Sequence, residues 1–177
     1  IGIAGANYGT DGQVMTSGGA GAAVAWEDAG GGASVLGDLT DVSMDITNFT
    51  DSLLIQTNSD GSAPGTGTLS SANDNIGIGK NAFAALTSAV DNVVLGNLAG
   101  AALTSARRCI LIGSDAGNDL TTATDAIFIG HGAGDGHDTE VRNIAIGLNA
   151  LGGVVAGGEY NICIGGQAGA TNTTGDK

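Results

Sequence analysis

Large side chains are scarce in this sequence. Its 177 residues include three Phe, two Tyr and one Trp, and the single proline is Pro64. Glycine, by contrast, occurs 33 times. Isoleucine, valine and leucine must therefore supply nearly all of any hydrophobic core.

Positive charge is equally scarce. Asp and Glu total 18 against five Lys and Arg, which gives a net charge of −13. Residues 1–74 hold no Lys or Arg at all. A chain this acidic repels phosphate backbones, so we expect no nucleic-acid partner.

Long hydrophobic runs are missing as well. No apolar stretch reaches the length of a membrane span, and no signal peptide is visible, so we expect no membrane insertion. The chain opens on Ile1 rather than Met, which indicates a processed product or a fragment.

What is abundant is one short phrase closed by glycine, as in "NIAIGLNALGG" from Asn143. The closing glycines are spaced by 17, 17, 17, 17 and 18 residues. Alanine always follows three residues later, and aliphatic residues occupy the first and third positions before the glycine. The closing glycines are Gly79, Gly96, Gly113, Gly130, Gly147 and Gly165.

This spacing predicts strands. Residues two apart share one face of a strand, and the glycine that follows permits a sharp turn. Seventeen residues cannot bury a face alone, but stacked coils can. We therefore predict an all-β fold, a parallel β-solenoid or β-roll of about six 17-residue coils over residues 75–177. Glycine inside every phrase argues against an amphipathic helix.

The strand pattern raises the question of which face is buried. We expect the aliphatic pairs, such as Ile110 and Ile112, to stack inside the solenoid. The residue between each pair would then face outward, with Val94, Leu111 and Phe128 side by side. An outward apolar row indicates a partner chain, so these three residues are our predicted trimer-interface row.

A charged column lies five residues before each closing glycine. From coil to coil it reads Asp91, Arg108, Asp125, Arg142. Parallel stacking would bring these opposite charges about 5 Å apart. The alternative is a chance alternation on a solvated face.

The first part of the chain lacks this register. We divide the chain into a glycine-rich short-strand fibre element (1–35), a β-rich connector and linker (36–74) and the β-roll (75–177). Strands are expected within 9–32 and 36–61, and residues 62–75 read as a linker. So few large apolar residues would struggle to fold alone, and intertwining with identical chains would supply the missing core.

The repeat resembles the head repeats of trimeric autotransporter adhesins. Residues 9–26, "GTDGQVMTSGGAGAAVAW", together with "LGDLTDVS" and "GTGTLSSANDNIGIGKNAF", are closer to tail-fibre and appendage proteins of marine tailed bacteriophages. The resemblance implies left-handed parallel β-rolls, three chains to a rod. The 17-residue coil is longer than the usual adhesin head repeat.

One segment gathers metal-ligand residue types. "HGAGDGHDTE" contains His131, Asp135, His137 and Asp138 and ends on Glu140. Three-fold symmetry could collect such groups around an axis, but a glycine-rich segment reads as an outward, solvated loop. We predict no metal and treat the four residues as a candidate variable contact loop.

Catalytic machinery is not visible. Neither histidine lies beside a nucleophile, and "GIGKNA" is not a complete phosphate-binding loop, so we expect no enzyme activity and no cofactor. Cys109 and Cys163 would lie three coils apart, too far to pair within one chain. Both should be small core residues.

The sequence and the resemblance together predict a structural segment of a viral tail fibre or virion appendage. It would be an extracellular, homotrimeric rod with a short β-rich shaft, involved in host attachment. Its partners would be copies of itself, other tail proteins and a host cell-surface receptor. The alternatives are the head of a bacterial trimeric surface adhesin and, more remotely, an ice-binding solenoid. The latter rests on the column of "LTSA", "LTSA" and "LTTA" from Leu86 to Ala123.

Overall fold

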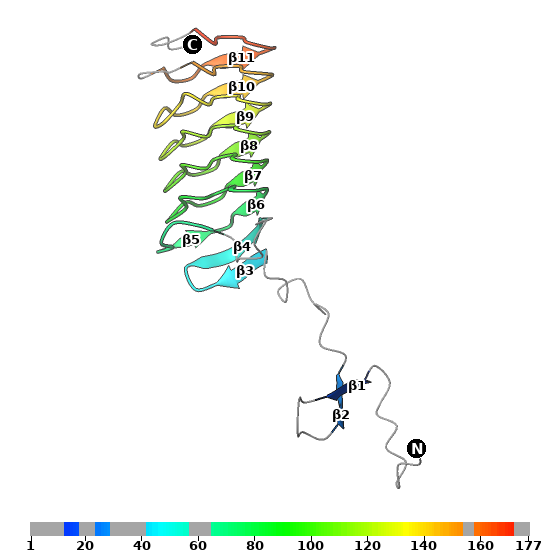
Figure 1. Cartoon of the computed structure of the whole chain (residues 1–177). Coiled ribbons are helices and arrows are strands. Elements are labelled where there is room, and N and C mark those ends of the chain that lie inside the picture. Colours follow the sequence, from blue (N-terminus) through cyan, green and yellow to red (C-terminus); the bar gives the residue numbers. More distant parts are fainter. Residues whose placement is uncertain (1–12, 18–23, 29–41, 57–64, 154–157, 172–177) are drawn as a thin grey trace. The chain divides into compact units, whose positions relative to one another are not determined.

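The computed structural model describes residues 13–17, 24–28, 42–56, 65–153 and 158–171. Within these ranges all regular structure is β-strand. The chain divides into two compact units, residues 1–38 and residues 39–177 (Figure 1).

The first unit contains one antiparallel pair of strands. Strand β1 (Gln13–Ser17) pairs with β2 (Val24–Asp28), and Met15 lies opposite Trp26. The short strands expected within residues 9–32 are therefore confirmed. Our expectations for the segments around this pair lie outside the described residues.

The second unit is a parallel β-solenoid, as the repeat predicts. Its sheet runs in the order β11-β10-β9-β8-β7-β6-β4-β3, with β5 beside β4. The antiparallel pair β3 (Val42–Ile46) and β4 (Phe49–Ile55) forms one end, and β4 then pairs in parallel with β6. The remaining strands are β5 (Ala72–Asn73), β6 (Ile76–Ile78), β7 (Val93–Leu95), β8 (Ile110–Ile112), β9 (Ile127–Ile129), β10 (Ile144–Ile146) and β11 (Ile162–Ile164).

The solenoid begins earlier than the glycine phrases indicated. Residues 65–74 read as linker by composition, yet they already make the contacts of the repeat. The Ser70 N–H donates to the carbonyl of Thr87 at 2.8 Å, Ala72 is buried, and Asn73 bridges to Val90. Leu69 and Ser70 occupy the same positions as Leu86 and Thr87, one repeat of 17 later.

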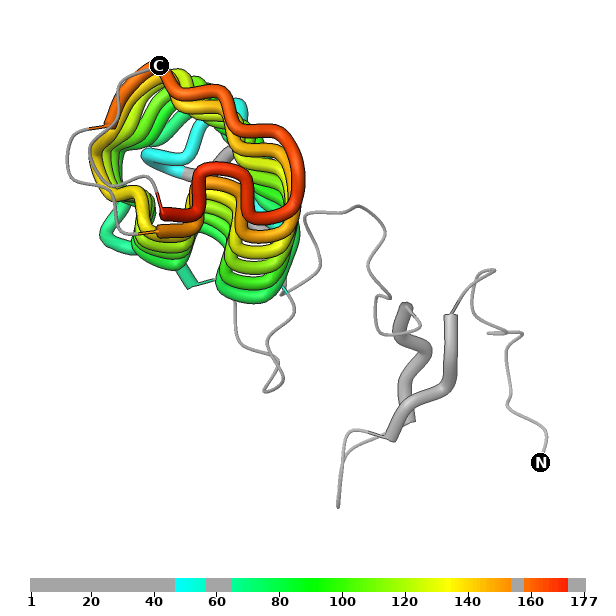
Figure 2. Tube along the Cα trace, turned by 90° about the horizontal axis from the view of Figure 1, so that it is seen from above, coloured from blue at the N-terminus to red at the C-terminus, as the bar shows by residue number. Residues whose placement is uncertain are grey.

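Successive coils superimpose when the stack is viewed along its axis (Figure 2). From β6 to β10 each strand residue pairs with the residue 17 later, as Ile110 does with Ile127, and between β10 and β11 the spacing is 18. Backbone bonds join coils outside the strands too, for example from the Thr104 N–H to the Thr121 carbonyl at 2.9 Å. The coils are thus held together at several places around their circumference.

The closing glycines are required by this close approach. Gly113 has a φ of 132°, and a Cβ built on it would meet the carbonyl group of Gly130 in the next coil. The same clash would occur at each closing glycine from Gly79 to Gly147, always with the next closing glycine. At Gly165, on the last described coil, φ is 124° but nothing lies within 4 Å of such a Cβ.

The structure corrects our assignment of the two strand faces. Val94, Leu111 and Phe128, predicted to face outward, are fully buried inside their own chain. The flanking aliphatic residues, predicted to form the core, face outward, and Ile110 remains 37% exposed. Alternation was predicted correctly, but the direction in which the chain curls was not.

Within each coil, the side chains at two interior positions have complementary sizes. The residue at the centre of a strand packs against the residue six positions later, and one of the two is always small. In coil order the pairs are Gly77 with Phe83, Val94 with Gly100, Leu111 with Gly117, Phe128 with Gly134, Ala145 with Leu151, and Cys163 with Gly169. A Cβ on Gly77 would strike the Phe83 ring, and one on Gly134 would strike the Phe128 ring.

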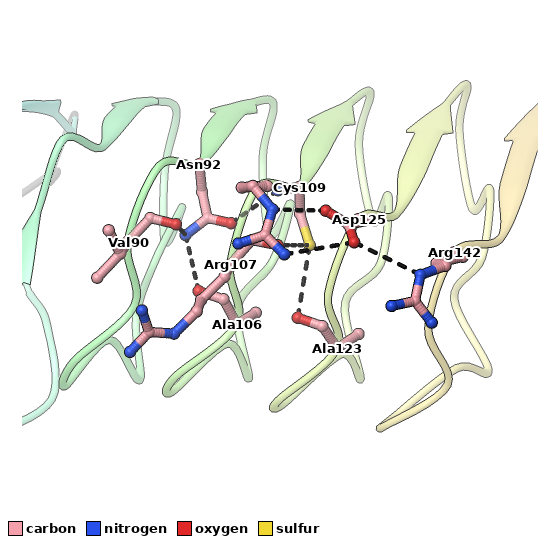
Figure 3. Close-up of polar contacts among 9 residues, drawn as sticks. Val90, Asn92, Ala106, Arg107, Cys109, Ala123, Asp125 and Arg142 are labelled. Carbon is pink, nitrogen blue, oxygen red and sulfur yellow. Dashed lines mark hydrogen bonds and ion pairs between the residues drawn. The ribbon is translucent and has the colours of Figure 1, made fainter.

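Buried asparagines satisfy backbone groups where the coil enters each strand. The Asn92 side chain donates to the Ala106 carbonyl at 3.0 Å and accepts the N–H of Cys109 at 2.9 Å (Figure 3). Cys109 takes the same position one coil later, and its thiol donates to the Ala123 carbonyl. Burial raises the pKa of this thiol to about 11. Both cysteines are free, Cys109 buried and Cys163 partly exposed.

We expect Gly113→Ala to destabilise the solenoid more than Gly165→Ala does. Both substitutions strain a left-handed backbone, which costs roughly 1–3 kcal/mol, but only the first also forces a methyl group into the next coil. Thermal unfolding followed by circular dichroism measures the difference. Equal losses would show that coil-to-coil contact is not what requires the glycine.

Candidate interaction surface

The outer face of the strand stack is an aliphatic surface. It consists of the first and third residues of strands β6 to β11, which are all Ile, Val or Leu. We call it the aliphatic face. Ile76 and Ile78 are 44% and 43% exposed, and Ile162 and Ile164 are 67% exposed. The other members are partly exposed.

The extent of this face is unusual for a surface exposed to water. Its twelve side chains lie on six neighbouring strands, and all of them are partly or largely exposed. Monomeric proteins rarely expose contiguous apolar patches larger than a few hundred Å². This contiguous apolar face is therefore the candidate interaction surface of the described residues.

A column of charged residues borders the face at the entry to each strand. The Nε atom of Arg108 lies 2.6 Å from Oδ1 of Asp125. Nε of Arg142 lies 3.7 Å from Oδ2 of the same carboxylate (Figure 3). Arg142 also donates to the hydroxyl of Tyr160 at 2.7 Å, with its guanidinium over the ring. The predicted attraction between neighbouring coils is confirmed from Arg108 to Arg142.

The electrostatics of the column agree with its geometry. The hydrogen bond from Arg108 lowers the pKa of Asp125, assisted by the charges of Arg108 and Arg142. The same hydrogen bond raises the pKa of Arg108, and the more distant charge of Asp91 adds to it. These groups are exposed to solvent, so the column's contribution to stability is small.

A threonine column runs along a second side of the coil. The hydroxyls of Thr87, Thr104 and Thr121 each donate to the backbone carbonyl of the residue 17 positions later, at 3.0, 3.1 and 2.9 Å. The acceptor of the last bond is Asp138. These hydroxyls thus link one coil to the next.

The predicted contact loop is more deeply embedded than expected. His131 and Asp138 are exposed and Asp135 is partly buried, but His137 is fully buried. The expectation that His137 lies in an outward, solvated loop is therefore wrong. Its position explains why: His137 occupies the place of the buried Leu86, Leu103 and Leu120 of earlier coils. That leucine column, with a period of 17, was visible in the sequence.

The remaining residues of this loop are brought near two other acids. Nε2 of His131 lies 3.7 Å from Oδ2 of Asp115. Burial raises the pKa of Asp135, and the charges of Asp119 and Asp115 act in the same direction. Within the described residues, no three His, Cys, Asp or Glu side chains are arranged to hold a metal ion.

The fold defines the class: the second unit is a repeat protein of the parallel β-solenoid type. Comparison with protein-family models, with curated proteins and with solved structures gives no match. In the part of the chain that the structure describes, no helix is long and apolar enough to span a membrane.

We expect Asp125→Asn to lower the melting temperature slightly, because both arginine contacts of the carboxylate are lost. Asn tolerates the left-handed backbone at this position, where φ is 61°, so the change is mainly one of charge. The loss should shrink at about 1 M salt, where screening is strong. Asp119→Asn, which removes an exposed carboxylate outside the column, is the control. A loss that is independent of salt would argue against the charge ladder.

Proposed function

We propose that this protein is a structural component of a viral tail fibre or virion appendage and forms a homotrimeric rod. The observation that carries the proposal is the aliphatic face, which a single chain leaves partly or largely exposed on every strand from β6 to β11. Three copies packed face to face around an axis parallel to the stack would cover it. Because every coil presents the same kind of residue, neighbouring chains would meet alike at every level.

The proposed rod acts by shape and position rather than by catalysis. Titratable side chains of the described residues lie mainly in columns along the outside of the coil, as with Arg108, Asp125 and Arg142. The interior is filled by aliphatic and aromatic residues and by asparagines bonded to the backbone. Such a stack provides length and stiffness, because each coil is supported by its neighbours.

Host attachment is the role in which a rigid acidic rod serves a virion. It would hold a binding tip away from the particle, and the receptor contact would lie in exposed outer turns. His131 and Asp138 belong to such a turn. The partners would be two further copies of the chain, other tail proteins and a host cell-surface receptor, in an extracellular setting.

A second candidate is the head of a bacterial trimeric surface adhesin, which the same aliphatic face would suit. Immunolabelling of purified virions and of cell envelopes, with antibodies raised against this chain, separates the two. Label on virion tails supports the fibre. Label confined to envelopes overturns it in favour of the adhesin. Ice binding, the remote alternative, would require thermal hysteresis, and its three-threonine column is short for that purpose.

We expect Ile110→Asp to dissociate the trimer, because it places a charge in a contact from which water is excluded, at a cost of several kcal/mol. Light scattering coupled to size exclusion reports the mass. Thr122→Asp adds the same charge to an exposed position outside the aliphatic face and should leave the trimer intact. If the wild-type protein is a monomer, the proposal is wrong. If it is a stable dimer, the aliphatic face is an interface but the proposed trimer is wrong.

A further inference from the structure

We propose that the coil containing His137 is an acid-sensitive weak point of the rod, which opens locally when the imidazole takes up a proton. The inference rests on the interior of a single solenoid and not on the proposed function. If the acid-sensitive opening is disproved, the proposal of a trimeric fibre is unaffected. If the trimeric fibre is disproved, this inference is unaffected.

The first observation is the position of His137 in a column of leucines. Leu86, Leu103 and Leu120 occupy this position in the three preceding coils, and all are fully buried. His137 is buried to the same degree. A titratable ring has thus replaced a leucine in the core.

The second observation is how the ring is surrounded. It packs edge-on against the Phe128 ring, with 5.4 Å between centroids. Neither ring nitrogen has a hydrogen-bond partner among the described residues. A buried polar group without a partner costs free energy, and a buried charge without one costs much more. Protonation therefore produces a species that this core accommodates less well than the neutral ring.

The third observation is a buried carboxylate three residues later. Glu140 stands where earlier coils have Ala89, Ala106 and Ala123, and it is only 5% exposed. Its Oε2 accepts the backbone N–H groups of Asp138 at 3.1 Å and Thr139 at 3.2 Å. That carboxylate is engaged in holding its own turn.

The electrostatic balance at the ring has a definite sign. Burial lowers the pKa of His137 below its ordinary value, and the charge of Glu140, a polar contact with the backbone of Leu151 and the charge of Asp138 oppose that shift only in part. Both charges come from the ring's own turn. Phe128 of the same coil and the backbone of Leu151 in the next coil also lie near the ring, and neither carries a charge.

The direction of the pH effect follows from this balance. Above the ordinary histidine pKa the ring is neutral in the closed and the open coil, so pH has no effect through this group. As pH falls below about 6.5, the open coil binds the proton first, and closure becomes less favourable. Within that window the open population rises by up to about tenfold per pH unit. Asp135, whose pKa is raised by burial, acts in the opposite sense.

The experiment compares wild type with His137→Leu, which restores the leucine column, between about pH 7.5 and pH 5.5. This window lies above the ordinary carboxylate pKa values. Hydrogen-exchange protection is measured for the amides of residues 131–140, and thermal unfolding is followed alongside. Because the chain has two histidines, His131→Leu is the matched control at an exposed site.

We expect wild type and His131→Leu to lose protection in this coil, by about tenfold across the lower pH unit, and to melt at lower temperature as pH falls. His137→Leu should show neither change. If His137→Leu does not fold, His137→Met fills the same space without titrating and serves in its place. Wild-type protection that stays constant across the window, or a loss that persists when His137 is replaced, would overturn the inference.

Discussion

Close approach of one coil to the next is the constraint on which the rest of this structure depends. The closing glycine of each coil lies so near the carbonyl group of the next that no side chain fits between them. Backbone bonds of 2.8 to 2.9 Å, such as those from Gly113 to Leu95 and from Ile110 to Ala126, hold this spacing. A coil cannot change its path without breaking contacts with both neighbours. The sequence repeats every 17 residues because each coil must follow the path of its neighbours.

The same constraint limits what the interior can contain. With the coil outline fixed, a large residue at one position demands a small one opposite, as Phe83 does with Gly77 and Phe128 with Gly134. Polar groups fit only where the backbone offers partners, as it does for Asn92. His137 does not follow this rule, because among the described residues no hydrogen-bond partner satisfies either ring nitrogen. The acid-sensitive opening that we infer is a consequence of this mismatch.

The outside of the coil is less constrained, and different columns of residues on it make different kinds of contact. The threonine hydroxyls add bonds between coils, and the charged column adds exposed ion pairs that contribute little. The aliphatic face keeps the same kind of residue from coil to coil although the single chain leaves it partly exposed to water. Contact with other chains would cover it, and our proposal of a trimer rests on this.

Much of this architecture could be predicted from the sequence, because stacked coils need similar residues at equivalent positions and the sequence therefore repeats. The glycine spacing gave the strands and their parallel pairing, and the alternation of Asp and Arg gave the ladder around Asp125. Alternation along a strand shows which residues share a face, but not which face is buried when both are apolar. That is why Val94, Leu111 and Phe128 were placed outside and the isoleucines inside. The complementary sizes of residues six apart, and the leucine column ending at His137, were signals that could have decided it.

The sequence by itself therefore determined the period, the strands and the columns of this protein. Which side of each strand faces the interior was decided only by the tertiary structure. The left-handed turns after each strand, at Gly113 and Gly117 for example, curl the chain toward the central residue of the strand and away from its aliphatic neighbours. A backbone direction of this kind is a property of the whole closed coil, and the alternation of residues along one strand does not encode it.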